Sequence, residues 1–155
     1  AIMSLLSTTL SLKGRALRYL AAREHSRVEL ERKLAAFEET PGEVARTLDE
    51  LQAKGFINEQ RVLDSVVHRR ASRLGASRIR QELLGKGLDA QAVRQAVAQL
   101  QITELERTRE VWRKKFGEPA NDAAGRARQM RFLASRGFGA EAIRKVVSGT
   151  DDAVD

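Results

Sequence analysis

The sequence predicts an all-α fold in which three tandem three-helix repeats form an elongated, curved array. Proline, which interrupts helices, occurs in the 155 residues only at Pro41 and Pro119. Apolar residues recur three or four positions apart from Leu12 to Val147, and no stretch alternates cleanly between apolar and polar residues. That spacing places apolar side chains on one face of a helix. The sequence also matches itself when it is shifted by 49 or 50 residues, which is typical of a repeat protein.

The internal match involves the positions that a helical repeat would bury. Shifting the first segment by 49 residues places Leu30, Leu34, Val44, Leu48 and Leu51 on Ile79, Leu83, Val93, Val97 and Leu100. Shifting the second segment by 50 residues places Leu83, Gly87, Leu88, Val93 and Val97 on Leu133, Gly137, Phe138, Ile143 and Val147. Neither comparison needs a gap, and a glycine stays in register with the apolar residues. We therefore interpret the match as one structural unit used three times.

Each repeat is too small to hold a large core alone, so we expect neighbouring repeats to pack on one another. The expected segments are a flexible N-terminal segment at 1–10, helical repeats at 11–55, 56–101 and 102–149, and an acidic tail at 150–155. Ala1 and Ile2 precede Met3, and we interpret them as vector-derived residues ahead of the native start.

Each repeat begins with a helix whose apolar face follows from the spacing. These faces consist of Leu12, Ala16 and Leu20 in the first repeat, Val62, Leu63, Val66 and Val67 in the second, and Leu105, Trp112 and Phe116 in the third. A glycine stop signal separates the second helix from the third, at Gly87 and at Gly137. Asp89 then stands where it can cap the next helix, and Gly55 and Asn58 supply the same two signals between the first and second repeats.

Start signals of another kind occur inside the first repeat. Ser26 and Glu29 have the spacing of a capping box, in which each side chain binds the backbone amide of the other residue. Thr40, Pro41 and Glu43 predict a second capping box, with Thr40 as the capping residue and Pro41 at the first helical position. The sequence therefore predicts two helix starts, one at each of these boxes.

Composition narrows the range of functions. The chain has 28 basic and 21 acidic residues and a net charge of +7, which favours polyanions or acidic protein surfaces as partners; a merely well-solvated helical surface is the alternative. Cysteine is absent, which excludes disulfides, thiolate metal sites and cysteine nucleophiles. No apolar run approaches the roughly 20 residues of a membrane span. The N-terminal stretch lacks the basic start of a secretory signal, so we expect a cytoplasmic protein that does not bind membranes.

Histidine positions give no support to an enzyme. His25 and His68 lie in different repeats, and neither has a second ligand at a metal-binding spacing. We interpret His25, which lies at a helix junction, as a capping or surface residue. No nucleophile and base pair can be named, so we expect no catalytic activity and no cofactor or metal.

Acidic residues also have ordinary explanations. Glu29 with Lys33, and Glu110 with Lys114, are spaced as pairs on a solvated helix face. The segment 85–87 has a lysine between two glycines, but it lacks the spacing and the serine or threonine of a phosphate-binding loop. We interpret this segment as the end of a helix.

Positive charge is concentrated in the second and third repeats. Residues 1–55 hold 9 basic and 8 acidic residues, whereas residues 61–86 hold 7 and 2 and residues 107–145 hold 11 and 4. Arginine binds phosphate or carboxylate through two parallel hydrogen bonds, which favours a polyanion or an acidic groove as the partner. The candidate partner-binding residues are Arg69, Arg70, Arg73, Arg78, Arg80, Lys86, Arg126, Arg128, Arg131 and Arg136. Aromatic residues lie at core-like spacings, so sequence-specific reading of bases is not expected.

Three motifs resemble those of the RecX family of regulatory proteins. The first covers residues 16–27 with Glu29-Leu30 and Lys33-Leu34, the second covers 78–83 with Lys86-Gly87, and the third covers 131–133 with 136–138 and Ile143. Their order and spacing extend the resemblance from Leu12 to Val147. The sequence departs from the family pattern at 40–42, which replaces a glycine junction, and at Asn58-Glu59, which replaces an acidic pair.

The resemblance implies a bacterial regulator of the RecA recombinase, active in homologous recombination, DNA repair and the SOS response. Proteins of this family bind RecA and the RecA–DNA filament, limit filament extension, and so suppress strand exchange, ATP hydrolysis and co-protease activity. They also bind DNA. We expect a monomer that lies in the filament groove or at its growing end. Arginines of the last two repeats would contact filament carboxylates and the phosphates of single- or double-stranded DNA, which would make binding salt-sensitive.

A DNA-binding helical protein that acts without RecA is the alternative. A three-helix unit superficially resembles helix-turn-helix modules, although no recognition helix with base-reading residues is evident. A pull-down with RecA in the absence of DNA would separate these two functions. A hydrolase would require a catalytic constellation that the sequence does not provide.

Overall fold

The computed structural model describes residues 10–149, and within this range the chain forms nine α-helices, one short 3-10 helix and no strand. The predicted all-α fold is therefore confirmed. Residues 1–9, including Ala1 and Ile2, and the acidic tail lie outside the described residues.

The helices form two compact units. One contains the described residues up to Ser65 together with Lys86–Leu88, and the other contains Val66–Gly85 and the residues from Asp89 onward. The division falls within helix α5 (Glu59–Arg70), so it does not coincide with the ends of the sequence repeats. Each unit is described by itself below.

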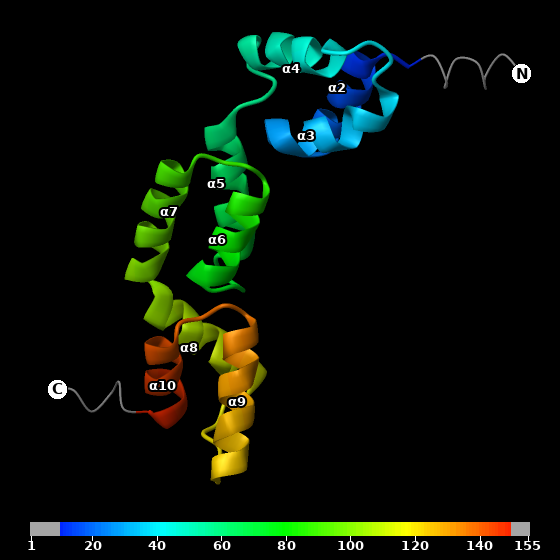
Figure 1. Ribbon diagram of the computed structural model, residues 1–155. Coiled ribbons are helices and arrows are strands. Elements are labelled where there is room, and N and C mark those ends of the chain that lie inside the picture. The colour runs from blue at the N-terminus through cyan, green and yellow to red at the C-terminus, as the bar shows by residue number, and fades with distance from the viewer. Residues whose placement is uncertain (1–9, 150–155) are drawn as a thin grey trace, which may run out of the picture. The chain divides into compact units, whose positions relative to one another are not determined.

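The first unit is a small helical cluster around an aliphatic core. It consists of α2 (Leu12–Ala22), α3 (Arg27–Leu34), a 3-10 turn (Ala35–Phe37), α4 (Glu43–Ala53) and the first part of α5. The helices α2, α3 and α4 pack on one another, as Figure 1 shows. The core contains Leu12, Ala16, Leu30, Leu34, Val44, Leu48, Leu51 and Ile57, with Leu20 partly buried beside it. The apolar face that the spacing predicted for the first helix, formed by Leu12, Ala16 and Leu20, therefore faces this core.

The second unit contains five further helices and the end of α5. They are α6 (Ala76–Gly85), α7 (Ala90–Ile102), α8 (Glu104–Lys115), α9 (Ala123–Ser135) and α10 (Ala140–Ser148). Helix α6 packs beside α7, and α8, α9 and α10 pack together (Figure 1). The α8–α10 core contains Leu133, Phe138, Ile143 and Val147, with Val111, Trp112 and Phe132 packed against it. The Trp112 indole also donates to the Gln129 amide oxygen at 2.9 Å, which supports the core reading of this aromatic residue.

Most of the predicted caps are present. The Ser26 and Glu29 capping box forms at the start of α3. The Asn58 side chain accepts from the Arg61 amide at 2.9 Å, and the Asp89 side chain accepts from the Ala92 amide at 3.0 Å. These short-range bonds satisfy amides that a helix start leaves without partners, which is why sequence spacing alone could predict them.

The predicted cap by Thr40 is wrong. Helix α4 begins after Gly42, which adopts φ +85° and offers no side chain. The Glu43 carboxylate does accept from the Thr40 amide at 3.3 Å, but the Val44 amide is bound by the Glu38 carboxylate at 2.9 Å. The Glu43 amide, which the threonine hydroxyl was expected to bind, donates to the Thr40 carbonyl oxygen at 3.0 Å instead, and Glu38 supplies the side-chain acceptor at this helix start.

A glycine turn of the second repeat meets the start of α3 in the first unit. Gly87 has φ +74°, and a β-carbon there would lie 2.3 Å from a methyl group of Val28. The Ser26 hydroxyl donates to the Lys86 carbonyl oxygen at 2.7 Å. Only glycine fits a turn that is both left-handed and this closely covered.

The same contact recurs one repeat later, within the second unit. Gly137 has φ +90°, and the Ser77 hydroxyl donates to its carbonyl oxygen at 2.8 Å. The Gly75 amide donates to the Arg136 carbonyl oxygen at 2.8 Å. A β-carbon on Gly75 would lie 2.2 Å from the Gly137 oxygen. The two backbones can therefore approach this closely only because residue 75 has no side chain. The glycines aligned in the sequence are thus contact points between repeats as well as helix stops.

His25 is buried, so its prediction as a surface residue is wrong, whereas its contact with the carbonyl oxygen of Arg23, the C-cap residue of α2, agrees with a capping role. Only 2% of the residue is exposed. The Nδ1 atom lies 3.0 Å from the Arg23 carbonyl oxygen, and Nε2 lies 3.2 Å from the Lys33 Nζ. Burial lowers the pKa of His25, and the charges of Arg23 and Lys33 lower it further, against the opposing effects of the Arg23 carbonyl and Glu29. The surroundings of His25 therefore favour the neutral imidazole over the protonated form.

We expect the first unit to lose stability as the pH falls below about 6.5, the ordinary pKa of histidine. The folded pKa of His25 is lowered, so the unfolded chain takes up the proton first. The contribution of neutral His25 is complete above the unfolded pKa and is lost as the pH falls toward the folded one. Thermal melting of the full chain between pH 7.5 and 5.5 should show this loss. His25→Gln should flatten the pH dependence, whereas His68→Gln, at an exposed position of α5, should leave it in place.

Candidate functional site

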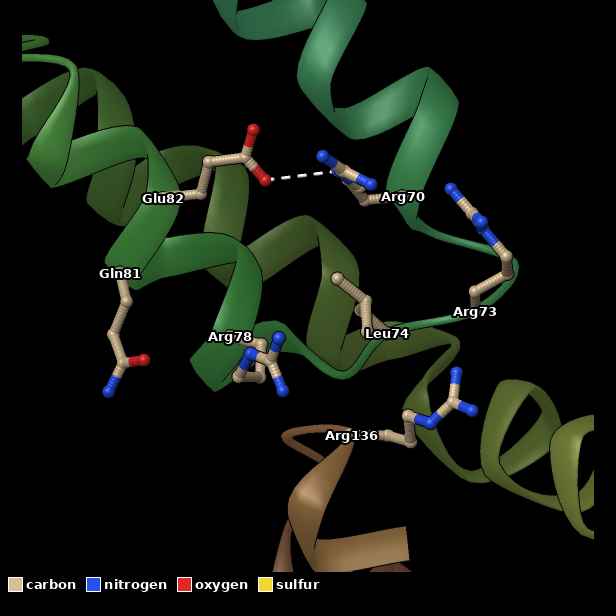
Figure 2. A pocket seen from close by; sticks show the side chains of 7 residues that line it. All are labelled: Arg70, Arg73, Leu74, Arg78, Gln81, Glu82 and Arg136. Atoms are coloured by element: carbon tan, nitrogen blue, oxygen red, sulfur yellow. Dashed lines mark hydrogen bonds and ion pairs between the residues drawn. The ribbon is translucent and has the colours of Figure 1, made fainter.

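Four of the predicted arginines line one hollow in the second unit. They are Arg70, Arg73, Arg78 and Arg136, and the lining is completed by Leu74, Gln81 and Glu82. The hollow has a volume of about 450 Å³. Figure 2 shows the four guanidinium groups arranged around Leu74. We call this feature the arginine hollow.

The walls of the arginine hollow come from segments far apart in the sequence. Arg70 is the last residue of α5, and Arg73 lies in the turn that follows it. Arg78 lies in the first turns of α6, with Gln81 and Glu82 three and four residues later on the same helix face. Arg136 follows α9 and belongs to the glycine turn that contacts the start of α6. The contact between the second and third repeats therefore creates the hollow.

The hollow is positively charged, and part of its hydrogen-bonding capacity is unused. Arg70 Nε donates to Glu82 Oε1 at 3.1 Å, and Arg78 donates to the Ser135 carbonyl oxygen. The Arg136 guanidinium lies over the Phe132 ring, 4.7 Å from its centroid. Within residues 10–149 the Arg73 guanidinium forms no hydrogen bond or ion pair. Four cations and one carboxylate, with donors that protein groups do not occupy, suit a phosphate or carboxylate ligand.

A carboxylate and a guanidinium behind the hollow hold its walls together. Glu104, at the start of α8, accepts through Oε1 from the Ala76 amide at 3.0 Å and through Oε2 from the Gly139 amide at 3.0 Å. It thereby caps the starts of two other helices, α6 and α10, although Glu104 itself belongs to α8. Arg107 pairs with Glu104 at 3.0 Å and donates to the Leu74 carbonyl oxygen at 2.8 Å. The pair therefore fixes the turn that carries Arg73 and the start of the helix that carries Arg78.

Sequence reasoning missed Glu104 and Arg107. Arg107 is largely buried, with 13% of its side chain exposed, and it also donates to the carbonyl oxygens of Ala71 and Leu100. Burial lowers the pKa of Arg107, and Glu104 opposes that shift. Their spacing of three residues resembles an ordinary surface pair. The structure shows that the pair also binds Ala71, Leu74, Ala76 and Gly139, which lie 28 to 36 residues away in the sequence.

The other predicted arginines do not line the hollow. Arg69 and Arg80 are exposed on α5 and α6. Arg126, Arg128 and Arg131 are exposed on α9, where Arg126 and Arg128 are two residues apart and therefore face different directions. Their role in partner binding stays a prediction.

Lys86 belongs to the first unit and has a structural contact there. Its ammonium donates to the Glu29 carboxylate at 3.0 Å, and 13% of its side chain is exposed.

The predicted solvated pair of Glu29 with Lys33 is wrong, because Glu29 binds Arg23 at 2.7 Å and Lys86 instead. Burial alone would raise the pKa of Glu29, but the bonds from Arg23, the Ser26 amide and Lys86 outweigh it and lower the pKa to about 2. The predicted pair of Glu110 with Lys114 does lie on an exposed helix face.

A wider groove of about 850 Å³ lies between α5 and α8 in the same unit. It is lined by Val67, His68, Ala71, Ser72, Thr103, Glu106, Arg107, Arg109, Glu110, Arg113 and Lys114. Glu110 pairs there with Arg113, so charge is more nearly balanced than in the arginine hollow. The smaller arginine hollow is therefore the stronger candidate for an anion site.

Residues 10–149 contain no group of three histidine, cysteine or acidic side chains that could hold a metal ion. No helix in the described range is both long and apolar enough to cross a membrane.

Comparison with family models gives three matches in chain order. Residues 13–51 match the first three-helix domain of RecX, residues 58–97 match the second, and residues 103–147 match the third. The glycine contacts described above therefore join successive family domains.

Curated relatives agree over nearly the whole chain. The regulatory protein RecX of Leptothrix cholodnii is 58% identical over 142 residues, which cover 92% of this chain and 90% of that protein. The regulatory protein RecX of Ralstonia nicotianae is 45% identical over 153 residues, which cover 99% of this chain and 96% of that protein.

Solved structures share the fold at low sequence identity. The crystal structure of RecX from Lactobacillus salivarius matches with a TM-score of 0.70 at 19% identity, covering 90% of this chain and 94% of that one. A crystal structure of another regulatory protein RecX matches with a TM-score of 0.71 at 18% identity, covering 96% and 77%. Three consecutive family domains, close relatives along the full length and a shared fold lead to one conclusion: this chain belongs to the RecX family of regulatory proteins.

Proposed function

We propose that this chain is a non-catalytic, cytoplasmic negative regulator of RecA, which binds the RecA–DNA filament and limits its extension. Strand exchange, ATP hydrolysis and co-protease activity would fall because each of them depends on an extended filament. Family membership supports a regulatory role, and the three motifs that resemble those of RecX proteins support RecA as the partner.

The arginine hollow is the observation that carries this proposal. A filament presents DNA phosphates and protein carboxylates, and both are ligands of guanidinium groups. The hollow gathers Arg70, Arg73, Arg78 and Arg136 from two successive repeats. Hydrogen bonds between the repeats hold this arrangement, so little ordering is needed before a ligand binds.

Replacing Arg73 and Arg136 together with glutamine is expected to weaken inhibition of RecA by about tenfold or more. The two guanidinium groups donate no side-chain hydrogen bond within residues 10–149, so their loss should leave the fold intact. A charge-assisted bond to an anion contributes about 1.5–3 kcal/mol, so the loss of even one such bond corresponds to about tenfold. The measurement is RecA ATPase on single-stranded DNA against substoichiometric amounts of each variant, repeated at two salt concentrations.

A double replacement of Arg18 and Arg46 with glutamine is the matched control. Both residues are exposed in the first unit, and their side chains likewise have no hydrogen-bond partner in the described range. Each double variant removes two charges, so only the location differs. Equal inhibition by the two variants would reject the arginine hollow as the binding site. No inhibition by the unmodified chain at any salt concentration would reject the proposed function itself.

A DNA-binding protein that acts without RecA remains the second candidate. The positive charge and the absence of aromatic side chains from the hollow favour contact with phosphates rather than bases. A pull-down of purified RecA without DNA separates the two, because only the proposed regulator would retain RecA.

A further inference from the structure

We propose that Glu82 is a built-in competitor for Arg70, and that it sets how tightly the arginine hollow holds a phosphodiester backbone. This inference rests on the proposed function only in taking the hollow as the surface that meets the RecA–DNA filament. Glu82 is the sole carboxylate among the lining residues of this hollow. It lies on α6, one turn after Arg78, and faces the same space (Figure 2).

The pair of Arg70 with Glu82 is placed where a ligand can exchange with it. Its Nε to Oε1 distance is 3.1 Å, and the side chains are 33% and 25% exposed. The pair is partly buried, and enough of both side chains is exposed for a ligand to reach it. The connection between the repeats is made by other groups, namely the Gly75 amide, Ser77 and the Glu104 carboxylate. The connection between the repeats therefore does not rest on this ion pair, which leaves the pair available for a role in binding.

The carboxylate opposes binding in two ways. It occupies Arg70 Nε, which an incoming phosphate oxygen would otherwise use, and its charge repels any anion that enters beside it. Arg73 and Arg136 donate no such bond to a carboxylate within residues 10–149. A ligand thus meets unoccupied guanidinium donors at those two arginines, and it gains the Arg70 Nε donor only when it displaces Glu82.

The lining favours a phosphodiester backbone over an acidic protein segment. Leu74 is the sole apolar side chain among the seven lining residues, so a protein segment would find little apolar surface to bury. Backbone phosphates need only donors, which guanidinium groups supply in paired geometry. No aromatic residue lines the hollow, so bases would not be selected by stacking.

The test compares Glu82→Gln with the unmodified chain in binding a fluorescent single-stranded oligonucleotide without RecA. Glutamine keeps the length and an oxygen for Arg70 but removes the charge. We expect affinity to rise about three- to tenfold at low salt, and the slope of log K against log salt to steepen by about 0.7, the value for one further phosphate contact. If Glu82 only braces α6 against α5, the variant should instead bind more weakly and melt at a lower temperature.

Two controls separate this effect from a change in overall charge. Glu141→Gln removes the same charge from an exposed site on α10, where Glu141 pairs with Lys145 at 3.6 Å, and it should leave the salt slope unchanged. Combining Glu82→Gln with Arg70→Gln should abolish the gain, because the competitor then has no arginine to release. A gain that persists without Arg70, or that Glu141→Gln reproduces, would overturn the proposal.

Two further outcomes identify which idea fails. Unchanged DNA binding by Glu82→Gln with tighter binding of RecA alone would overturn the phosphate assignment, and would place a carboxylate segment in the hollow. The predicted rise in DNA affinity, found in a chain that never inhibits RecA, would support the role of Glu82 while rejecting the proposed function.

Discussion

Replacing Gly75 with alanine is expected to lower the free energy of unfolding of the second unit by about 3 kcal/mol or more. The added β-carbon would lie 2.2 Å from the Gly137 carbonyl oxygen, and backbone atoms cannot give way as a side chain can. Relieving that overlap requires the start of α6 to separate from the turn after α9. The bonds from the Gly75 amide and the Ser77 hydroxyl would then be lost, at about 0.5–1.5 kcal/mol each. Urea unfolding followed by circular dichroism measures the change.

Gly85→Ala is the matched control for this substitution. Gly85 ends the same helix, and a β-carbon there would meet nothing within 4 Å. Alanine favours helix by up to about 1 kcal/mol over glycine, so this variant should be as stable as the original chain or more stable. Gly75→Ala should also lose inhibition of RecA, since the contact that it disrupts forms the arginine hollow. Equal unfolding midpoints for the two glycine variants would contradict the close approach of the two repeats.

Replacing Glu104 with alanine is expected to cost about 3–5 kcal/mol of unfolding free energy, the range for removing one partner of a buried ion pair. The change would leave the Arg107 guanidinium in a mostly buried site with carbonyl and hydroxyl acceptors alone. It would also remove the acceptor for the Ala76 and Gly139 amides, at the starts of two helices. Thermal and urea unfolding of the full chain both report this loss.

Glu106→Ala provides the comparison for Glu104. It lies in the first turn of the same helix, but its side chain is exposed and makes no bond within residues 10–149. Its removal should change stability by no more than about 0.5 kcal/mol. Glu104→Gln should fall between the two, because the amide oxygen still accepts one bond while the charge that offsets Arg107 is gone. Similar midpoints for all three variants would show that Glu104 does not hold the helices together.

The helical repeat could be predicted because its determinants are local. Leu30, Leu34 and Leu48 are fully buried at the spacing that predicted them, and Ser26 and Asp89 cap the helices that follow. The predicted cap by Thr40 failed because the helix begins later, after Gly42, and its Val44 amide is bound by the Glu38 carboxylate, five residues before the helix. Capping rules describe the neighbours of a helix start, and this partner lies beyond them.

The sequence could predict which type of residue the candidate site contains, but not which arginines lie together in space. Charge segregation indicated the second and third repeats, and its candidates include the four arginines that line the hollow, Arg70, Arg73, Arg78 and Arg136. It could not separate them from Arg69, because adjacent residues on a helix point about 100° apart and both are equally basic. The hollow depends on bringing Arg136 beside the start of α6, a contact made by backbone groups that leave little trace in the sequence besides the aligned glycines.

The contacts between repeats also bear on the order in which the chain can fold. The Ser26 hydroxyl donates to the Lys86 carbonyl oxygen, and the Ser77 hydroxyl donates to the Gly137 carbonyl oxygen. In both bonds the two residues are 60 positions apart in the sequence. During synthesis, each of these serines can therefore form its bond to the next repeat only after the 60 residues that follow it have left the ribosome. Contacts of such long separation slow folding, whereas the helices themselves form quickly. We expect the nascent chain to hold formed but loosely docked helices until the following glycine turn emerges, and the arginine hollow to assemble last.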